Sequence, residues 1–314
     1  MIITNTTANL DLDTLTAARA AQLIAEQKVT SEQLVRACLA RIDAHQHLNA
    51  FITLNAEVAI AQAKAWDKHL SDGGRPLPLG GVPIAVKDNV HVAGLPNTAG
   101  TPALKDFIPT HHAPVVQKLV DAGAIIIGKS NMHELAFGVT GYNAAYHTAE
   151  IKGVRNACDP SRIAGGSSSG SAVAVAAGLV PVAIGTDTGA SVRQPCALNG
   201  CVGFRPTTGR YSQAGITPIS HTRDTAGPMA HNVADIALLD SLITGAAVLP
   251  PKPAQEIRLG IARYFWHLLD DEVNQQAHAA LARLCDAGVT LVEVDMPGLE
   301  EANAAVSFPV VMHA

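Results

Sequence analysis

Apolar and polar positions along the chain form two kinds of pattern, which predict strands and helices in alternation. Short apolar runs bounded by glycine, proline or polar residues are typical of buried strands. We expect such strands at residues 82–87, 124–128, 180–185, 201–204, 258–262 and 289–294. Apolar residues at helical spacing, or runs of small residues, predict helices at 114–122, 171–177, 233–244 and 271–287. Strands that alternate with helices favour a layered α/β fold, with a mixed, largely parallel central sheet flanked by helices.

A further helix is predicted to begin after Thr30. Thr30 and Gln33 have the spacing of a capping box, in which the hydroxyl caps the first turn and the glutamine bonds back to the cap residue. Apolar residues then recur on one helical face, at Leu34, Val35, Cys38, Leu39 and Ile42. We expect this face to pack against the core.

Length and composition limit the classes of protein that the chain can belong to. It has 314 residues, of which 48% are hydrophobic, so it can bury a large core as one big domain or two modest ones. Its net charge is −5 and it has no basic run, so nucleic acid and anionic membranes are poor partners. Residues 1–5 lack the basic and apolar regions of a signal peptide. Residues 163–186 are uncharged, but their Ser, Gly and Ala content and Pro181 favour a buried core segment over a membrane span.

The cysteines and histidines have neither the pattern of a disulfide framework nor that of a metal site. The five cysteines are odd in number and include no Cys-x-x-Cys pair, which favours free thiols in a reducing cytoplasm. The 13 histidines are scattered, and His111 and His112 are adjacent rather than four residues apart on a helix. We therefore expect a cytoplasmic protein without a metal or another cofactor.

Two glycine-dense segments that contain serines flank an apolar stretch. Residues 165–171 read Gly-Gly-Ser-Ser-Ser-Gly-Ser, and residues 185–193 read Gly-Thr-Asp-Thr-Gly-Ala-Ser-Val-Arg. A flexible linker would have polar flanks, whereas residues 172–184 predict a small-residue helix and an apolar strand. A Walker-type phosphate loop would have a lysine at the turn into the helix, and none is present. We expect a loop whose serines point into a site at the start of a helix.

These two segments, together with four others, resemble the amidase signature family of hydrolases. The other four are residues 80–88, 128–132, 203–207 and 224–228, in the order and at the separations that the family has. Six segments in order are far more specific than any single motif.

The resemblance also implies how the chain is organised. It implies one amidase domain over residues 1–314, with a helical region at 1–70, the signature core at 71–250 and the start of a C-terminal α/β part at 251–314. Members of the family usually continue further, so the chain is expected to lack the rest of the C-terminal part. The apolar residues 308–314 are expected to be interior.

The family cleaves carbon–nitrogen bonds with a Ser–Ser–Lys triad, and the resemblance assigns three residues to it. Ser191 would be the nucleophile that forms an acyl-enzyme, and Ser167 a relay that follows a cis peptide bond. Lys87 would be the base that takes the proton through Ser167. Lys87 ends an apolar strand, and burial there would favour the neutral lysine that a base requires. The alternatives are that Lys87 is an exposed lysine at a strand end, and that Lys129, at another strand end, is the base.

The resemblance places the oxyanion hole in backbone N–H groups of four consecutive residues, Thr188, Gly189, Ala190 and Ser191. Ala190 stands where the family usually has glycine, and alanine does not easily adopt a positive φ. Either that conformation is not required here, or the hole is slightly reshaped.

Several neighbouring residues are expected to support this site. Asp187 and Arg193 bracket Ser191, and we expect them to brace the loop by an ion pair. Ser168 is the loop serine best placed to contact the triad, while the other loop serines bond the backbone and the helix start.

The segment after residue 131 has a different expected role. By similarity, the backbone near Ala136 lines the acyl site. His133, Glu134 and His221 lie beside family-like sequence but match no catalytic position, so structural roles are expected for them.

The segments 189–193, 203–206 and 220–227 are most similar to those of indoleacetamide and mandelamide hydrolases. The resemblance therefore implies hydrolysis of the C–N bond of small carboxylic amides of the aryl-acetamide type, with the amide and water as reactants. The alternatives are an amidotransferase A-type subunit that releases ammonia from glutamine, and a truncated, inactive member of the family. A homodimer is compatible with each of these functions.

Overall fold

The computed structural model describes residues 11–267 and 269–305. The chain divides into two compact units, Met1–Ala247 and Val248–Ala314. The expectation of one domain with boundaries at residues 70 and 250 stays a prediction, and the apolar residues 308–314 lie outside the described part of the chain.

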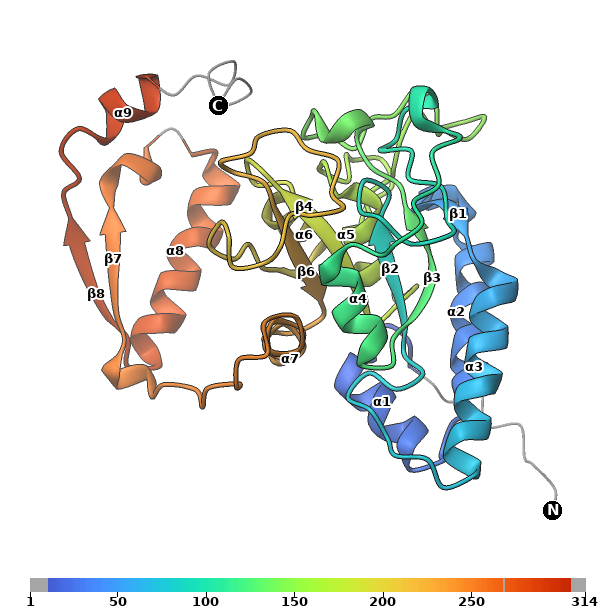
Figure 1. The fold of residues 1–314 in the computed structure, drawn as a ribbon. Coiled ribbons are helices and arrows are strands. Elements are labelled where there is room, and N and C mark those ends of the chain that lie inside the picture. Colours follow the sequence, from blue (N-terminus) through green and yellow to red (C-terminus); the bar gives the residue numbers. More distant parts are fainter. Residues whose placement is uncertain (1–10, 268, 306–314) are drawn as a thin grey trace. The chain divides into compact units, whose positions relative to one another are not determined.

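A six-stranded mixed sheet forms the centre of the first unit (Figure 1). Its strand order is β1-β3-β2-β4-β6-β5. The central strands β3, β2 and β4 are parallel to one another, and the pairs β1–β3, β4–β6 and β6–β5 are antiparallel. The strands run over Phe51–Leu54 (β1), Pro83–Lys87 (β2), Ile125–Ser130 (β3), Val182–Asp187 (β4), Val202–Gly203 (β5) and Thr225–Ala230 (β6).

The apolar pattern predicted neither β1 nor β6 of this sheet, and β6 is the more unusual of the two. It has the sequence Thr-Ala-Gly-Pro-Met-Ala, and both glycine and proline are unfavourable inside a strand. Nevertheless it pairs along its full length with β4. Its glycine is required by close packing, because a Cβ atom at Gly227 would lie 2.5 Å from the carbonyl oxygen of Phe204.

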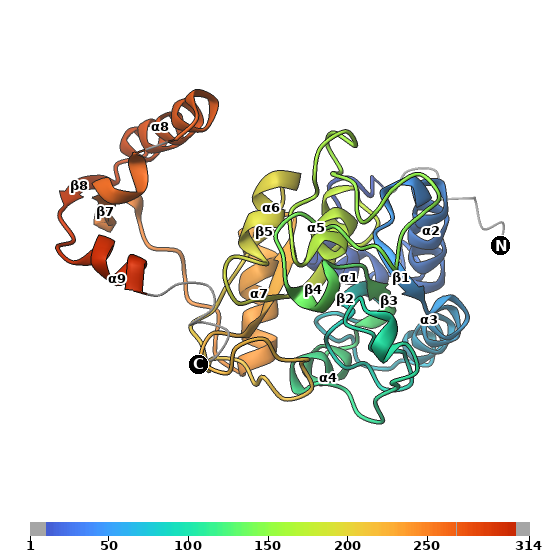
Figure 2. The same ribbon diagram turned by 90° about the horizontal axis from the view of Figure 1, so that it is seen from above.

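Helices cover both faces of this sheet. They are Ala17–Ala25 (α1), Ser31–Ala44 (α2), Ala56–Ser71 (α3), Pro114–Asp121 (α4), Ser169–Ala176 (α5), Arg193–Asn199 (α6) and Val233–Thr244 (α7). Figure 2 shows α5 and α6 on one side of the strands and α4 on the other. The capping box predicted at Thr30 and Gln33 is present at the start of α2. Helix α5 is buried on all sides, which explains why its sequence has no polar face.

The second unit has its own small α/β arrangement. Strands Arg258–Ala262 (β7) and Thr290–Val294 (β8) are parallel, as a strand–helix–strand connection requires. Helix Asp271–Asp286 (α8) connects them and contacts β8, and helix Leu299–Ala305 (α9) follows. Short 3-10 turns lie at Ala254–Glu256 and Arg263–Trp266 in this unit and at Gln46–Leu48, Pro102–Leu104 and Glu134–Ala136 in the first unit.

The parallel centre of the large sheet determines where reactive side chains can meet. The carboxyl ends of β2, β3 and β4 lie at one edge of the sheet, so Lys87, Ser130 and Asp187 end neighbouring strands there. The loop that leads into α5 contains the consecutive serines and reaches the same edge.

Two further properties of the described residues concern membranes and metal ions. Within residues 11–267 and 269–305, no helix combines the length and apolar character that crossing a bilayer requires. The same residues contain no group of three or more His, Cys, Asp or Glu side chains placed to hold a metal ion.

Candidate active site

Lys87 is the centre of a buried polar cluster at the carboxyl edge of the sheet. Its Nζ atom lies 2.7 Å from Ser167 Oγ and 2.7 Å from Thr186 Oγ1, and it also lies 3.5 Å from the Thr186 carbonyl oxygen. Both Lys87 and Ser167 have 0% of their surface exposed. The alternative of an exposed strand-end lysine is therefore wrong for Lys87.

The surroundings of Lys87 favour a neutral amine. Burial lowers the pKa of Lys87 to about 7, while the more distant carboxylates of Asp187 and Asp224 act in the opposite direction. Its nearest partners are hydroxyl oxygens, which can either accept a proton from the amine or donate one to it. Near pH 7 the amine is consequently able to take up a proton.

The Gly-Gly-Ser turn that holds Ser167 depends on very close backbone packing. The Gly166–Ser167 peptide bond is cis, and Gly165 has a φ of +79°. A Cβ atom at Gly165 would lie 2.8 Å from the Cα atom of Pro195, and one at Gly166 would lie 3.0 Å from the amide nitrogen of Gly141. Larger residues would push Ser167 away from Lys87.

The two serine-containing segments meet directly. The Ser168 N–H donates to the carbonyl oxygen of Ser191 at 3.1 Å. The Ser168 hydroxyl donates to the Thr186 carbonyl oxygen at 3.0 Å and accepts from the Thr186 N–H at 3.2 Å. Ser191 is 8% exposed, whereas Ser167 is fully buried. The structure thus brings Lys87, Ser167, Ser168 and Ser191 into one region, with Ser191 nearest to solvent.

The remaining loop serines have scaffold contacts. Ser171 Oγ lies 2.7 Å from Ser130 Oγ and donates to the Ile184 carbonyl oxygen at 3.3 Å. These bonds attach the start of α5 to the end of β3 and to the middle of β4.

Asp187 organises the loop that carries Ser191. Its carboxylate accepts the N–H groups of Ala190 at 2.9 Å and of Val192 at 3.1 Å. The expected ion pair with Arg193 is present at 3.0 Å. Burial acts to raise the pKa of Asp187, but the hydrogen bonds from Arg193, Ala190 and Val192 outweigh it, so the pKa is lowered and the carboxylate stays ionised.

Ala190 adopts the conformation for which glycine is usual, with a φ of +97°. The positive φ is therefore used here despite the methyl group. Because the Ala190 N–H donates to Asp187, it is not free to bind an oxyanion in this conformation. No group of the described residues accepts a hydrogen bond from the N–H of Thr188, Gly189 or Ser191.

Two residues that the sequence did not single out have central positions. Thr186 provides both a hydroxyl for Lys87 and backbone partners for Ser168. Arg205 forms a second ion pair with Asp187, at 3.1 Å. Both residues lie in segments that resemble the family, at 185–193 and 203–207. A threonine in a strand, however, does not by itself indicate a functional role. The partner of Arg205 could not be identified from the local sequence, because Asp187 is 18 residues away.

Lys129, the second candidate for the base, does not contact the serines. It pairs in register with Val86, whereas Lys87 pairs with Ser130, so Lys87 and Lys129 point to opposite faces of the sheet. Its Nζ atom lies 3.6 Å from Asp88 and donates to Pro96 O at 3.1 Å and Asn97 Oδ1 at 3.2 Å. Burial lowers the pKa of Lys129 to about 8, with Asp88 opposing the shift. Lys129 therefore has a carboxylate partner where Lys87 has hydroxyl groups.

The segment that follows β3 also reaches the serine loop. The His133 N–H donates to the Ser167 carbonyl oxygen at 3.1 Å, and burial lowers the pKa of the His133 side chain. Ala136 is buried and has a φ of +57°. Glu134 is half-buried, and His221 is exposed.

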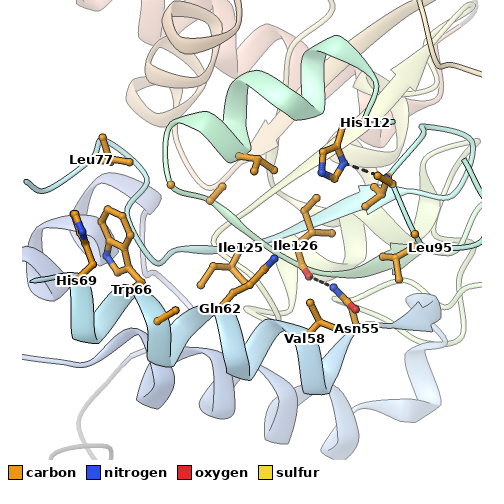
Figure 3. A pocket seen from close by; sticks show the side chains of 17 residues that line it. Asn55, Val58, Gln62, Trp66, His69, Leu77, Leu95, His112, Ile125 and Ile126 are labelled. Carbon is orange, nitrogen blue, oxygen red and sulfur yellow. Dashed lines mark hydrogen bonds between the residues drawn. The ribbon is translucent and has the colours of Figure 1, made fainter. Parts of the chain in front are cut away.

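A cavity of about 570 Å³ lies in another part of this unit, between α3 and β3 (Figure 3). Its wall is mostly apolar, with Trp66 and Val58 on α3 and Ile125 and Ile126 on β3. Lys87 and the serines of the cluster are not among its lining residues, so it is separate from the candidate active site.

The chain is similar to known proteins over most of its length. A family model described as Amidase matches residues 33–314. The chain is 56% identical over 299 residues to a mandelamide hydrolase from Pseudomonas putida, covering 95% of this chain and 59% of that protein. It is 42% identical over 283 residues to an indoleacetamide hydrolase from Agrobacterium vitis, covering 90% of this chain and 59% of that protein.

A solved structure agrees with these matches. A crystal structure of an amidase is similar with a TM-score of 0.85 at 38% identity, covering 92% of this chain and 65% of that chain. The chain thus spans about three fifths of the length of the curated relatives it matches. The predicted α/β fold, with its mixed sheet flanked by helices, is confirmed. The chain belongs to the amidase family.

Proposed function

We propose that this chain carries the catalytic groups of an amide hydrolase that works through an acyl-enzyme on Ser191. The observation that supports this most directly is the 2.7 Å contact between Lys87 Nζ and Ser167 Oγ in a fully buried site. Because the pKa of Lys87 is lowered to about 7, the amine can act as a base near neutral pH.

In the proposed acylation step, Ser191 Oγ attacks the carbonyl carbon of the amide. Its proton moves to Ser167 Oγ, while the Ser167 proton moves to the neutral amine of Lys87. The carbonyl π electrons move to oxygen and form a tetrahedral oxyanion. Thr186 Oγ1, 2.7 Å from Lys87 Nζ, would accept a hydrogen bond from the ammonium that results.

The oxyanion would be bound by the free backbone N–H groups of the nucleophile loop. We assign this role to Thr188, Gly189 and Ser191, because the Ala190 N–H donates to Asp187. Thr188 is itself held, since its hydroxyl donates to Asp224 at 2.5 Å. Ala190 would then shape the hole through its positive φ rather than as a donor.

Collapse of the tetrahedral intermediate breaks the C–N bond. Ser167 gives its proton to the leaving nitrogen and is reprotonated by Lys87, so that ammonia or an amine departs and Lys87 is neutral again. A water molecule then attacks the acyl-enzyme by the same route in reverse, which releases the carboxylic acid and restores Ser191.

The substrates we propose are small carboxylic amides of the aryl-acetamide type, such as mandelamide or indoleacetamide. The 56% identity to a mandelamide hydrolase and the 42% identity to an indoleacetamide hydrolase support this class. Buried Ala136, close to His133 and therefore to Ser167, would line the acyl side.

Labelling with a fluorophosphonate tests the proposed machinery. Mass spectrometry should locate the adduct on Ser191, and Ser191→Ala should abolish it. Lys87→Met and Ser167→Ala should slow labelling by about a hundredfold or more, because each interrupts proton removal. Ser71→Ala, at an exposed serine at the end of α3, is the control and should label at the rate of the unaltered protein.

The products of hydrolysis test the substrate class. Ammonia release should be faster from mandelamide and indoleacetamide than from glutamine. Faster release from glutamine would favour the amidotransferase alternative, and absence of both labelling and turnover in a folded protein would favour the inactive alternative.

We also propose a cytoplasmic location, without a nucleic-acid or membrane partner. The net charge of −5 and the five cysteines, all of them free thiols, support this. A homodimer stays a prediction, which sedimentation velocity tests.

A further inference from the structure

Arg205 joins the two segments that flank the nucleophile loop. It follows β5, and its guanidinium group donates from Nη1 to the carbonyl oxygen of Asp187 and, at 3.1 Å, to the Asp187 carboxylate. Its Nη2 atom donates to the Arg223 carbonyl oxygen at 2.7 Å and to Thr208 Oγ1 at 3.2 Å. A single side chain therefore holds the end of β4 and the turn that precedes β6.

Both segments continue directly into groups that the proposed oxyanion hole requires. On one side, Asp187 accepts the N–H groups of Ala190 and Val192, which lie on either side of Ser191. On the other side, Asp224 follows Arg223 and accepts the hydroxyl of Thr188. The Asp224 carboxylate is fixed in turn by the N–H groups of Ile219 and Ser220, at 2.7 and 3.0 Å.

The two arginines on Asp187 are not equivalent. The side chain of Arg193 is 51% exposed, whereas that of Arg205 is 18% exposed. Arg193 bonds only the carboxylate, through Nε and Nη2. Arg205 also bonds the backbone on both sides of the loop, and an ion pair shielded from water is weakened less by solvent than an exposed one.

We propose that Arg205 is a positioning residue for the nucleophile loop: by bridging Asp187 and Arg223, it sets the distance between Asp187 and Asp224 and thereby the direction of the backbone donors around Ser191. This inference rests on the proposed function. Arginine is suited to the task because its planar group presents several N–H donors in fixed directions, whereas a lysine ammonium is a compact charge on a flexible stem.

Arg205 also carries a charge that acts on Lys87 through Asp187. The Asp187 carboxylate raises the pKa of Lys87, and a cation paired with that carboxylate weakens its effect. Removing the cation should therefore raise the pKa of Lys87 and move the rise of activity with pH to higher pH. Removing only the planar arrangement of N–H donors, while the positive charge is kept, should leave the rise of activity at its original pH.

Two substitutions separate geometry from charge. Arg205→Lys keeps the charge, so kcat should fall by about tenfold or more with the pH at half-maximal kcat/KM unchanged. Arg205→Met removes both the charge and the planar set of donors. Its kcat should therefore fall further, and the pH at half-maximal kcat/KM should rise by about half a unit. KM should change less than kcat in both variants, because the loop donors act on the oxyanion that forms in the reaction.

The matched control is Arg210→Met. Arg210 is also an arginine in an ion pair, with Asp240 at 2.5 Å, and its side chain is 41% exposed. Its contacts do not include the nucleophile loop. Its kcat and pH profile should equal those of the unaltered protein.

The proposal is overturned if Arg205→Lys and Arg205→Met fold cooperatively and retain the original kcat and pH profile. If Arg205→Met does not fold, an unchanged kcat in a folded Arg205→Lys variant is enough to overturn the proposal. If the unaltered protein neither hydrolyses amides nor labels at Ser191, the proposed function fails, but hydrogen exchange still tests the positioning role. The amides of Ala190 and Val192 should then exchange at least about tenfold faster in Arg205→Lys, and unchanged exchange would overturn the proposal.

Discussion

At the scale of single residues, the chemistry of the site depends on which groups surround Lys87. Its two close partners are the hydroxyl oxygens of Ser167 and Thr186, both 2.7 Å from Nζ. A carboxylate at that distance would hold the amine in its charged form, as Asp88 favours the charged form of Lys129. The hydroxyl partners allow Lys87 to lose its proton and still keep both contacts.

The pH dependence of acylation follows from this environment. Because the pKa of Lys87 is about 7, kcat/KM should rise with pH through about 7 and then level off. Lys87→Met should lower kcat/KM by about a thousandfold and remove the rise. Lys118→Met, at an exposed lysine on α4, is the control and should preserve the profile. A profile for the unaltered protein that stays flat down to about pH 5 would contradict the role of Lys87.

At the scale of elements, the loop between β4 and α6 is held by one buried carboxylate rather than by regular secondary structure. Asp187 accepts backbone N–H groups on both sides of Ser191 and pairs with two arginines. This arrangement keeps Ala190 at a φ of +97°, a conformation that costs alanine free energy. The strain is local and can be measured.

Ala190→Gly should raise the free energy of unfolding by about 1 kcal/mol. It removes strain of about 1–3 kcal/mol, and the greater freedom of glycine in the unfolded chain offsets about 0.4–1 kcal/mol of that gain. Ala61→Gly, at an exposed position in α3, is the matched control and should lower the free energy of unfolding by about 1 kcal/mol. Urea unfolding measures both. Equal destabilisation by the two substitutions would show that Ala190 is not strained.

At the scale of the whole molecule, burial of two lysines lowers the free energy of unfolding at neutral and acidic pH. Two lysines, Lys87 and Lys129, are fully buried in the unit Met1–Ala247. Burial lowers the pKa of Lys87 to about 7 and that of Lys129 to about 8, against about 10.4 in an unfolded chain. Over the range between these values, the unfolded chain binds more protons than the folded chain, so each lysine makes stability rise with pH.

A substitution that removes the ionisable group isolates this contribution. Lys87→Met should gain stability relative to the unaltered protein below about pH 7, where the folded lysine is charged. The difference between the two proteins should then shrink toward about pH 10, by up to about 1.4 kcal/mol for each pH unit. Urea unfolding across this range gives the difference directly. A difference that does not depend on pH would mean that Lys87 is not buried as a neutral amine.

The sequence predicted the central strands because they are continuous apolar runs, and β2, β3 and β4 are buried along their whole length. It did not predict β6, because a strand with glycine and proline is recognisable only from its partners. For the site, the glycine-dense turns and the serines were visible as a pattern. The supporting residues Thr186 and Arg205 were not, because nothing in their local sequence identifies the groups that they contact.

The sequence by itself determined the local features: the buried strands β2, β3 and β4, the capping box at Thr30, the serine turns and a lysine at the end of each of two strands. Only the tertiary structure decided which lysine meets a serine. Parallel pairing sets Lys129 beside Val86 and Lys87 beside Ser130, so the two lysines point to opposite faces of the sheet. Strand register is a property of the pairing between distant segments, so it cannot be read from either strand alone.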